Sequence, residues 1–272
     1  MNSKLPYERM GDEPVMVPPA PAAPPGQALP GQIQWMPPPA ARLGCPPGLE
    51  YLAQLDQILV HQQVELLEAF TGWETENKYV IKNALGQQVY FASEESELCM
   101  RLCCKQQRGF MMHIVNNMNQ EVLRVVRPFQ CCAGCCWCAD SCDHCALTIS
   151  VETPGGEQLG HVRQRGSKWK PHFDILDANF EPVLKIWGPC CRCQTICCME
   201  DVDFTLLTYD ESQQIGKISK QWAGITREWF TKADNFGITF PLDLDVKVKG
   251  TLLAALFLID FMFFEHQKNK RR

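Results

Sequence analysis

The sequence lacks a secretory signal, and this absence decides how its cysteines are interpreted. Residues 1 to 10 contain no apolar core followed by a small-residue cleavage site. We therefore expect the chain to stay in the cytosol, where thiols are kept reduced. Structural disulfides are excluded on that expectation, even though the chain carries 16 cysteines.

The sequence also has little positive charge and no motif typical of an enzyme. Its formal net charge is -5 and its pI about 5.7, so nucleic acid is not an expected partner and any binding of anionic lipid must be local. Phosphate-loop and zinc-protease motifs are absent, and no Ser/His/Asp or Cys/His arrangement stands out. Four scattered histidines are interpreted as structural: His61, His113, His161 and His172.

No apolar run is long enough for a straightforward membrane span. As a helix, Thr251 to Phe264 would reach roughly 21 Å, short of the roughly 30 Å of hydrocarbon in a bilayer, and Asp260 would oppose insertion. We therefore favour a helix over 250–265 that is buried inside the protein. A span is the alternative if the bilayer thins or the helix recruits Val246 to Lys249. Under either interpretation, four residues represent the apolar helix: Leu252, Leu256, Ile259 and Phe263.

What the sequence does have is a dense group of cysteines. After Cys45, fifteen fall within residues 99 to 198, and seven of these stand between 131 and 145. In a reducing compartment, zinc ligation and fatty acylation are the two chemical uses to weigh, with burial as small apolar side chains as the plain alternative. Burial suits Cys99, Cys103 and Cys104 better than it suits the polar run from 131 to 145.

The spacing of the cysteine group fits zinc poorly. Cys132/Cys135 and Cys142/Cys145 form two Cys-x-x-Cys pairs with His144 nearby, but only six residues separate the pairs and three cysteines are left over. Reversible S-acylation needs only exposed thiols near a membrane, and the adjacent Trp137 suits that setting. Two or more acyl chains give a stable anchor where one does not.

The N-terminal region predicts an extended, disordered tail over 1–45. From Glu13 to Pro47 the sequence is rich in proline and alanine and almost uncharged. Pro18/Pro21 and Pro21/Pro24 have the P-x-x-P spacing that SH3-type, proline-reading domains recognise. Binding to such a partner and a passive tether both remain open.

The middle of the chain alternates with the period of two that is typical of strands. Five pairs of short segments flank turns and predict antiparallel hairpins: 79–81 with 89–91, 112–115 with 122–125, 147–151 with 160–162, 173–176 with 183–186, and 204–207 with 215–218. Such a series implies a sandwich or a closed barrel. Leucine spacing predicts one or two short helices between Gly48 and Glu68, and the alternation over 242–248 predicts a strand before the apolar helix.

Several runs resemble the phospholipid scramblase family, over about Cys45 to Glu265. They are Cys45–Leu52, Asp56–Gln63, Gly216–Trp222, Asp234–Gly237 and Phe257–Glu265. The resemblance implies a mainly β (α+β) fold, a closed antiparallel tubby-like barrel of about twelve strands around the hydrophobic C-terminal helix. It also implies a domain over 46–265, followed by a basic tail over 266–272.

The resemblance implies a function without covalent chemistry. The function is ATP-independent, calcium-triggered, bidirectional movement of phospholipids between membrane leaflets, at the cytoplasmic face of the plasma or a mitochondrial membrane. The family's palmitoylation segment corresponds to Cys131, Cys132, Cys135, Cys136 and Cys138, which favours acylation over a zinc-dependent binding module. The alternative is a palmitoylated adaptor, or a nuclear shuttle when not palmitoylated, that binds lipids or partner proteins without transporting lipid.

Two further family segments have counterparts here. An EF-hand-like calcium loop corresponds to residues 232–243, with Asp234, Phe236, Ile238 and Asp243 at ligand positions. Because Lys232 occupies the first ligand position and a phenylalanine side chain carries no oxygen, we expect calcium affinity of about millimolar or none, with a simple turn as the alternative. The family's nonclassical nuclear import signal, read by an import receptor, corresponds to Gly216, Lys217, Ile218, Ser219, Lys220, Gln221 and Trp222.

Overall fold

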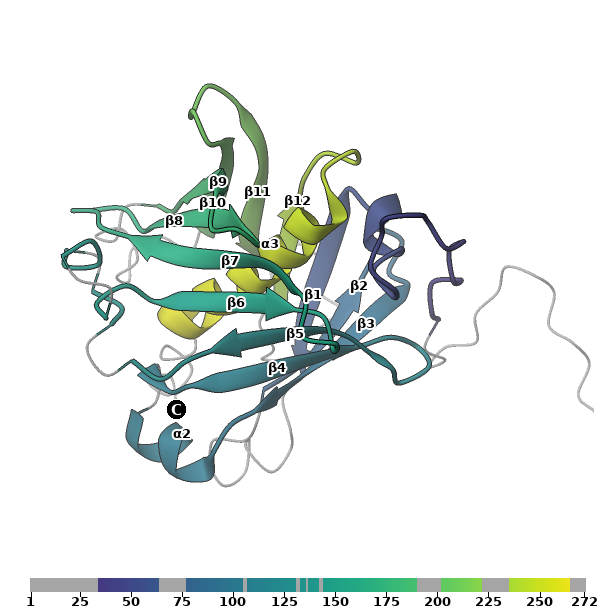
Figure 1. Ribbon diagram of the computed structural model, residues 1–272, viewed down its shortest axis with the longest axis horizontal. Coiled ribbons are helices and arrows are strands. Elements are labelled where there is room, and N and C mark those ends of the chain that lie inside the picture. The colour runs from purple at the N-terminus through teal and green to yellow at the C-terminus, as the bar shows by residue number, and fades with distance from the viewer. Residues whose placement is uncertain are drawn as a thin grey trace, which may run out of the picture. The chain divides into compact units, whose positions relative to one another are not determined.

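Twelve antiparallel strands in the described residues close into a barrel around a helix (Figure 1). This computed structural model describes residues 34–63, 77–104, 107–130, 133–135, 137–141, 144–189, 202–221 and 235–264. The strands are β1 (Gln57–Gln63), β2 (Lys78–Lys82), β3 (Gln88–Glu95), β4 (Phe110–Val115), β5 (Glu121–Arg127), β6 (Thr148–Glu152), β7 (Gln158–Arg165), β8 (His172–Asp177), β9 (Pro182–Trp187), β10 (Val202–Thr208), β11 (Gln214–Gln221) and β12 (Asn235–Thr239). Each strand pairs with its neighbour in sequence, and β12 pairs with β1, so the predicted mainly β barrel is confirmed.

The strands form because apolar and polar residues alternate along them. On β4, Phe110, Met112 and Ile114 are buried, whereas the residues between them are only partly buried. Tight turns join the strands: the Asn116 side chain accepts hydrogen bonds from the backbone N–H groups two and four residues later, at 2.9 and 3.0 Å. All five predicted hairpins are confirmed, as β2–β3, β4–β5, β6–β7, β8–β9 and β10–β11.

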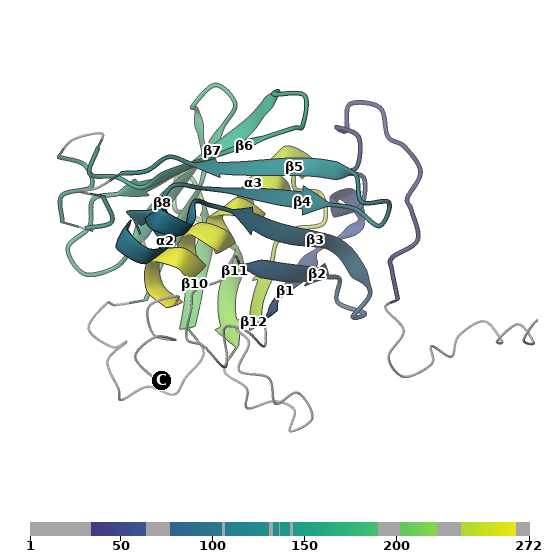
Figure 2. The same ribbon diagram turned by 90° about the horizontal axis from the view of Figure 1, so that it is seen from below.

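The barrel interior is filled by α3 (Val246–Ile259), which continues as the π-helical turn η4 (Asp260–Phe264) (Figure 2). Every residue from Lys249 to Ile259 is buried, including the predicted Leu252, Leu256 and Ile259, while Phe263 is partly buried. Asp260 accepts a hydrogen bond of 2.7 Å from the Tyr79 hydroxyl inside the barrel. The buried-helix interpretation is therefore confirmed. No helix in the described residues combines the length and the hydropathy needed to cross a membrane.

The predicted strand over 242–248 is wrong, because the helix begins at Val246. The Asp245 side chain caps it by accepting a hydrogen bond of 2.7 Å from the Lys247 backbone N–H. The alternation of apolar and charged residues predicted a strand whose charged side chains are all exposed, whereas Lys249 is fully buried. Its ammonium donates to the backbone oxygens of Leu52, Leu55 and Leu242 at 3.0, 2.7 and 2.7 Å.

The N-terminal part of the barrel also differs from prediction. In the described part of the predicted helical segment, residues 48–63, only the 3-10 helix η1 (Leu52–Gln54) forms, and β1 follows with Ile58 and Val60 buried between β2 and β12. The folded part begins before the predicted boundary at residue 45, since Trp35 forms a parallel bridge with Gln88 and Met36 is buried. Residues 1–33 of the predicted tail, including its P-x-x-P prolines, lie outside the described residues.

Candidate functional site at the cysteine-bearing end of the barrel

The strand topology gathers most of the cysteine-containing connections at one end of the barrel. Because successive strands are antiparallel, the connections after β3, β5, β7, β9 and β11 all lie at the same end. Fifteen of the 16 cysteines fall in three of these connections, 96–109, 128–147 and 188–201. The helix α3 starts after β12, at the opposite end, so its C-terminal turn also points to the cysteine-bearing end (Figure 1).

The first of these connections contains a short helix that the sequence did not predict, α2 (Leu98–Cys104). Cys99 and Cys103, one helical turn apart, are exposed, and Leu98 and Leu102 are 49% and 50% exposed. The interpretation of Cys99 and Cys103 as buried small apolar residues is therefore wrong, while Cys104 is half-buried. A hydrogen bond that the Cys99 thiol donates to the Cys103 sulfur raises the pKa of Cys99 above its ordinary 9.0.

A buried ion pair joins the chain segments that precede and follow α2. Arg108 and Glu94 face each other with side chains 1% and 0% exposed, and the guanidinium donates to both carboxylate oxygens at 2.8 and 3.1 Å. The Ser96 hydroxyl donates to the same carboxylate at 2.7 Å. Burial alone would raise the pKa of Glu94, but Arg108 outweighs it and lowers this pKa below 4.5. The start of the connection is thus fixed to the barrel wall.

The second connection is held by the buried side chain of Gln164 on β7. Gln164 accepts a hydrogen bond from the Leu147 backbone N–H at 3.2 Å and donates to the Gly134 carbonyl at 3.5 Å. Gly134 has a φ of +97° and its N–H donates to the Cys145 carbonyl at 3.3 Å, which closes the loop. Gln107, just after α2, donates to the Ala133 carbonyl at 3.3 Å, so the two cysteine-containing connections are in contact.

Two of the five predicted palmitoylation residues lie in the described part of the chain. Cys135 is exposed and Cys138 is half-buried, whereas Cys131, Cys132 and Cys136 lie outside it. Hydrogen bonds from the backbone N–H groups of Trp137 and Cys138, and then from the Cys138 thiol, lower the pKa of Cys135 below its ordinary 9.0. Since the thiolate is the nucleophile in acylation, the lowered pKa favours reaction of Cys135.

The zinc alternative receives no support from the described cysteines. No group of three or more potential ligands is found among the residues that the structure describes. Of the four predicted cysteine ligands, only Cys135 and Cys145 are among these residues. The zinc interpretation therefore stays an untested alternative.

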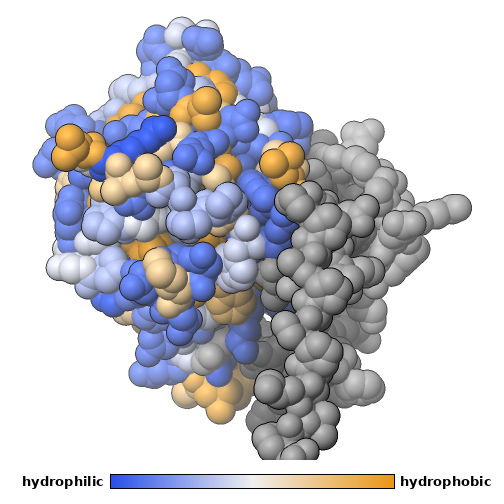
Figure 3. Space-filling view, turned by 90° about the vertical axis from the view of Figure 1, so that its right-hand side faces the viewer, coloured by the Kyte–Doolittle hydropathy of each residue, from blue (hydrophilic) through white to orange (hydrophobic). Residues whose placement is uncertain are grey.

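Exposed aromatic residues lie beside the cysteines. The rings of Trp137 and Trp169 meet edge to face at 5.6 Å and are 66% and 47% exposed. Asp140 joins their two connections, since it accepts the Gly166 N–H at 2.8 Å and lies 3.3 Å from the Arg165 guanidinium. Tryptophan is the residue typical of a membrane interface. At the opposite end, Figure 3 shows hydrophilic residues over most of the coloured surface and hydrophobic ones in small separate groups.

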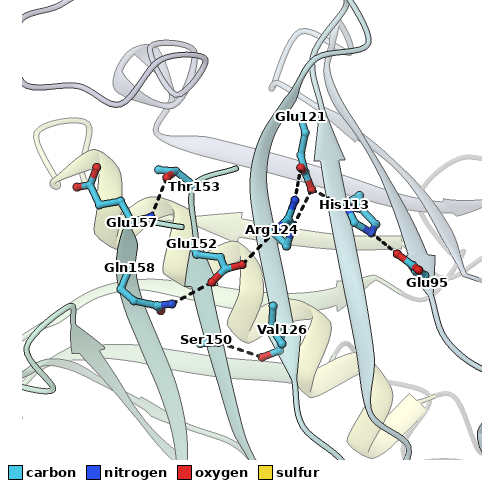
Figure 4. Close-up of polar contacts among 10 residues, drawn as sticks. All are labelled: Glu95, His113, Glu121, Arg124, Val126, Ser150, Glu152, Thr153, Glu157 and Gln158. Carbon is cyan, nitrogen blue, oxygen red and sulfur yellow. Dashed lines mark hydrogen bonds and ion pairs between the residues drawn. The ribbon is translucent and has the colours of Figure 1, made fainter. Parts of the chain in front are cut away.

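A polar ladder of side chains runs across the outside of β3 to β7 (Figure 4). His113 lies 2.7 Å from Glu95 and 2.6 Å from Glu121, and Arg124 joins Glu121 to Glu152. Burial would lower the pKa of His113, but hydrogen bonds to Glu121 and Glu95 outweigh burial and raise it above 6.5. His113 therefore has a structural role in this network, as the sequence indicated.

The ladder predicts a pH-dependent contribution to stability. A histidine with a raised pKa stabilises the fold fully below the unfolded pKa of about 6.5 and loses that contribution as pH rises through the higher folded value. We expect His113→Gln to lower the melting temperature most at pH 5 to 6 and least at pH 8.5. His61 is the control, because burial lowers its pKa and His61→Gln should show the opposite trend. A pH-independent difference for His113→Gln would contradict the prediction.

The predicted calcium segment is largely a strand. Phe236 and Ile238 are buried on β12, which pairs with both β1 and β11, and Asp243 is exposed beyond its end. An EF-hand loop wraps around its ion as a coil, and a doubly paired strand over 235–239 does not. Asp234 lies outside the described residues. The described residues therefore give no support to a calcium loop, and calcium binding stays a prediction.

The predicted import segment forms β11, which is paired with β10 and β12. Ser219 and Lys220 are buried, and the Lys220 ammonium lies 4.0 Å from the centre of the Phe264 ring. A Cβ on Gly216 would lie 2.0 Å from the Thr239 carbonyl oxygen. In the closed barrel Ser219 and Lys220 are therefore not accessible to an import receptor, whereas the Lys217 side chain is 46% exposed. Trp222 lies outside the described residues.

Comparison with known proteins gives consistent similarities. Residues 36–266 match the family model described as Scramblase. Human phospholipid scramblase 1 is 53% identical over 233 residues, which cover 86% of this chain and 70% of that protein. Human phospholipid scramblase 2 is 46% identical over 257 residues, covering 93% and 84%, and human phospholipid scramblase family member 5 is 47% identical over 249 residues, covering 89% and 88%. No solved structure matches the chain.

Proposed function

This chain belongs to the scramblase family, and on that premise we propose that it moves phospholipids between the two leaflets of a membrane, in both directions, without ATP and in response to calcium. The observation that carries the proposal is similarity over the whole barrel to proteins named phospholipid scramblase. Because the movement is downhill, the protein needs only to lower the barrier for passage of a polar headgroup through hydrocarbon.

The cysteine-bearing end is the part of the barrel that we propose to face the membrane. Exposed thiols, the leucines of α2 and the pair Trp137 and Trp169 lie there together. Palmitoylation of the segment from Cys131 to Cys138 would add two or more acyl chains, enough for stable anchoring. The side chains of α3 occupy the barrel interior, so the proposed lipid path runs along the outside of the barrel.

This attachment predicts a strong effect of removing the thiols. Changing Cys131, Cys132, Cys135, Cys136 and Cys138 together to serine should abolish palmitate incorporation into this segment and lower the membrane-bound fraction about tenfold or more. Cys45→Ser is the control, because Cys45 lies outside the connections at this end. Fractionation of cells after palmitate labelling measures both. A fully membrane-bound serine variant would contradict the proposed anchor.

Scrambling itself is tested in liposomes that contain fluorescent phospholipid and the purified palmitoylated chain. Dithionite bleaches the outer-leaflet half of the fluorophore, so we expect bleaching to exceed half with calcium and to stay near half without it. Bleaching beyond half that does not depend on calcium would support scrambling but contradict its regulation by calcium. Bleaching that stays near half under all conditions would overturn the proposed function.

A second candidate function is a palmitoylated adaptor that binds lipids or partner proteins without moving lipid. One observation favours it: the interior of the barrel is filled by α3, so the described residues offer no path for a lipid through the barrel. An adaptor would remain at the membrane through its acyl chains but would leave the bleached fraction near half. The liposome experiment therefore separates the two functions.

A further inference from the structure

A cavity of about 420 Å³ lies on the outer wall of the barrel over β6, β7 and β8. Its lining includes two arginines, Arg163 and Arg165, together with His161, Asp174 and the rings of Phe180 and Tyr209. The cysteines lie outside this lining, and Ser150 is the one residue drawn in Figure 4 that belongs to it. The cavity is therefore a separate feature of the barrel wall.

The strand register explains why the charged groups gather there. His161, Arg163 and Arg165 alternate along β7 with Val162 and Gln164, which are buried. Three basic side chains on one strand therefore share the outer face.

Neighbouring strands place further polar groups beside this row. Arg163 stands opposite Thr148 on β6 and Asp174 on β8, and His161 stands opposite Ser150. Arg163 and His161 are thus each beside a hydroxyl on β6, and Arg163 is also beside the Asp174 carboxylate on β8.

Several polar atoms of the cavity lining are buried without a hydrogen bond among the described residues, and two of them bear on the choice of ligand. They are Nε2 of His161 and Oδ1 of Asp174. Asp174 is only 8% exposed, and its Oδ1 lies 3.5 Å from Nε2 of His172. Burial raises the pKa of Asp174 and lowers that of His161. Because buried polar groups normally have partners, the unpaired atoms indicate that a ligand or ordered water completes this site.

Phe180 forms one wall of the cavity at a conformational cost. Its φ is +65°, a region that bulky residues rarely adopt, and its ring stacks on His161 with centroids 4.0 Å apart and planes 11° apart. The turn does not depend on the ring, since the Asp177 carboxylate accepts the N–H groups of Asn179 and Glu181. Backbone strain of this kind is found at ligand-binding sites.

The mixed charge of the cavity lining limits the chemical class of ligand that the cavity can bind. Guanidinium groups match phosphate oxygens in a fork geometry, which Arg163 and Arg165 can supply. Asp174 opposes them, and it lies 3.5 Å from Arg165, as Asp140 lies 3.3 Å from the same group. A ligand whose only charged group is a phosphate would be repelled by the Asp174 carboxylate. A ligand that also carries an ammonium group would place that group beside Asp174 and the aromatic rings.

We propose that this cavity binds a zwitterionic phospholipid headgroup, with its phosphate on Arg163 and Arg165 and its ammonium on Asp174. The inference deepens the proposed function and rests on it for the choice of a lipid as the source of the headgroup. Water-soluble phosphodiesters of the same chemistry are the other source. A headgroup held on the outer wall lies on the path outside the barrel that the filled interior requires.

The test is isothermal titration of the full-length chain with dihexanoyl phosphatidylcholine below its critical micelle concentration. We expect Arg163→Gln and Asp174→Asn each to weaken binding about tenfold, the first by loss of a charged hydrogen bond to the phosphate and the second by loss of the ion pair with the quaternary ammonium. Arg124→Gln is the matched control, because Arg124 also lies on the outside of the barrel but not in the cavity lining. Unchanged affinity in both cavity variants, or no binding to the original chain, would overturn the inference.

Three additional measurements identify which part of the ligand the cavity recognises. Phe180→Gly should weaken binding while leaving the melting temperature equal or higher, since glycine relieves the positive φ; unchanged affinity would count against the site.

Glycerophosphocholine should bind if the headgroup suffices. Dihexanoyl phosphatidic acid should bind less tightly than the phosphatidylcholine, and tighter binding that Asp174→Asn leaves unchanged would overturn the zwitterionic assignment. Binding without scrambling in liposomes would keep this inference and remove the proposed function, whereas scrambling without binding would do the reverse.

Discussion

Replacing Arg108 by methionine should destabilise the barrel by about 3 to 5 kcal/mol, because it leaves the Glu94 carboxylate buried without its partner. The two side chains are 1% and 0% exposed, and their contact is bidentate. The guanidinium also lies 4.6 Å from the centre of the Phe261 ring at the end of the central helix. Urea denaturation of the full-length chain measures the loss of free energy of unfolding.

The cause can be separated from simple loss of packing. The double variant Glu94→Gln/Arg108→Met removes the unpaired charge and should recover part of the loss. An exposed pair provides the matched control, since Lys217 and Asp203 are 46% and 44% exposed at 3.0 Å and Lys217→Met should cost less than about 1 kcal/mol. An equal cost for both single variants would contradict the role of the buried charge.

The lowered pKa of Glu94 gives the same pair a pH signature. A carboxylate with a depressed folded pKa stabilises the fold above its unfolded pKa and loses that contribution as pH falls through the folded value. The pair should therefore contribute at neutral pH and lose its contribution below about pH 4. In Arg108→Met the carboxyl can be protonated to relieve its burial, so the variant should gain stability relative to the original chain as pH falls.

Ten of the twelve strands followed from the sequence because each belongs to a hairpin. In a hairpin the alternation and the turn residues lie close together in the chain, so the signal is local. The other two strands, β1 and β12, pair with each other over residues 57–61 and 235–239, far apart in sequence. Because no short turn joins these two strands, no local hairpin pattern identified them. The leucine spacing around β1 predicted a helix, and the family resemblance assigned the residues of β12 to a calcium loop. Closure of the barrel is therefore what sequence periodicity could not predict.

The same distinction applies to the candidate site. The cysteine group was visible in the sequence as composition, but the grouping of its connections at one end depends on strand order. The cavity had no sequence signal beyond His161, Arg163 and Arg165 at every second position of one strand, because Asp174 and Tyr209 join them only through the fold. The aromatic residue at position 180 became significant only when the structure placed it at a positive φ, where hairpin turns favour glycine or asparagine.

Deleting the chain from residue 246 onward should unfold the barrel outright. The deletion removes eleven consecutive buried residues, 249–259, and burial of each large apolar side chain contributes about 1.5 to 3 kcal/mol. For the six large apolar residues among them the sum is about 9 to 18 kcal/mol, which equals or exceeds the total stability of a typical domain, about 5 to 15 kcal/mol. Six of these residues are leucine, isoleucine or phenylalanine: Leu252, Leu253, Leu256, Phe257, Leu258 and Ile259.

The control is a chain that ends after Phe264 and so keeps the whole central helix. We expect native-like circular dichroism and slow proteolysis for this control, and an expanded, rapidly cleaved chain for the one that ends at Asp245. The difference matters for function, because a helix that holds the barrel together cannot leave it to cross a membrane without unfolding the wall. A folded, protease-resistant barrel without α3 would mean that the helix is free to insert into lipid, and the lipid path along the outer wall would lose its structural basis.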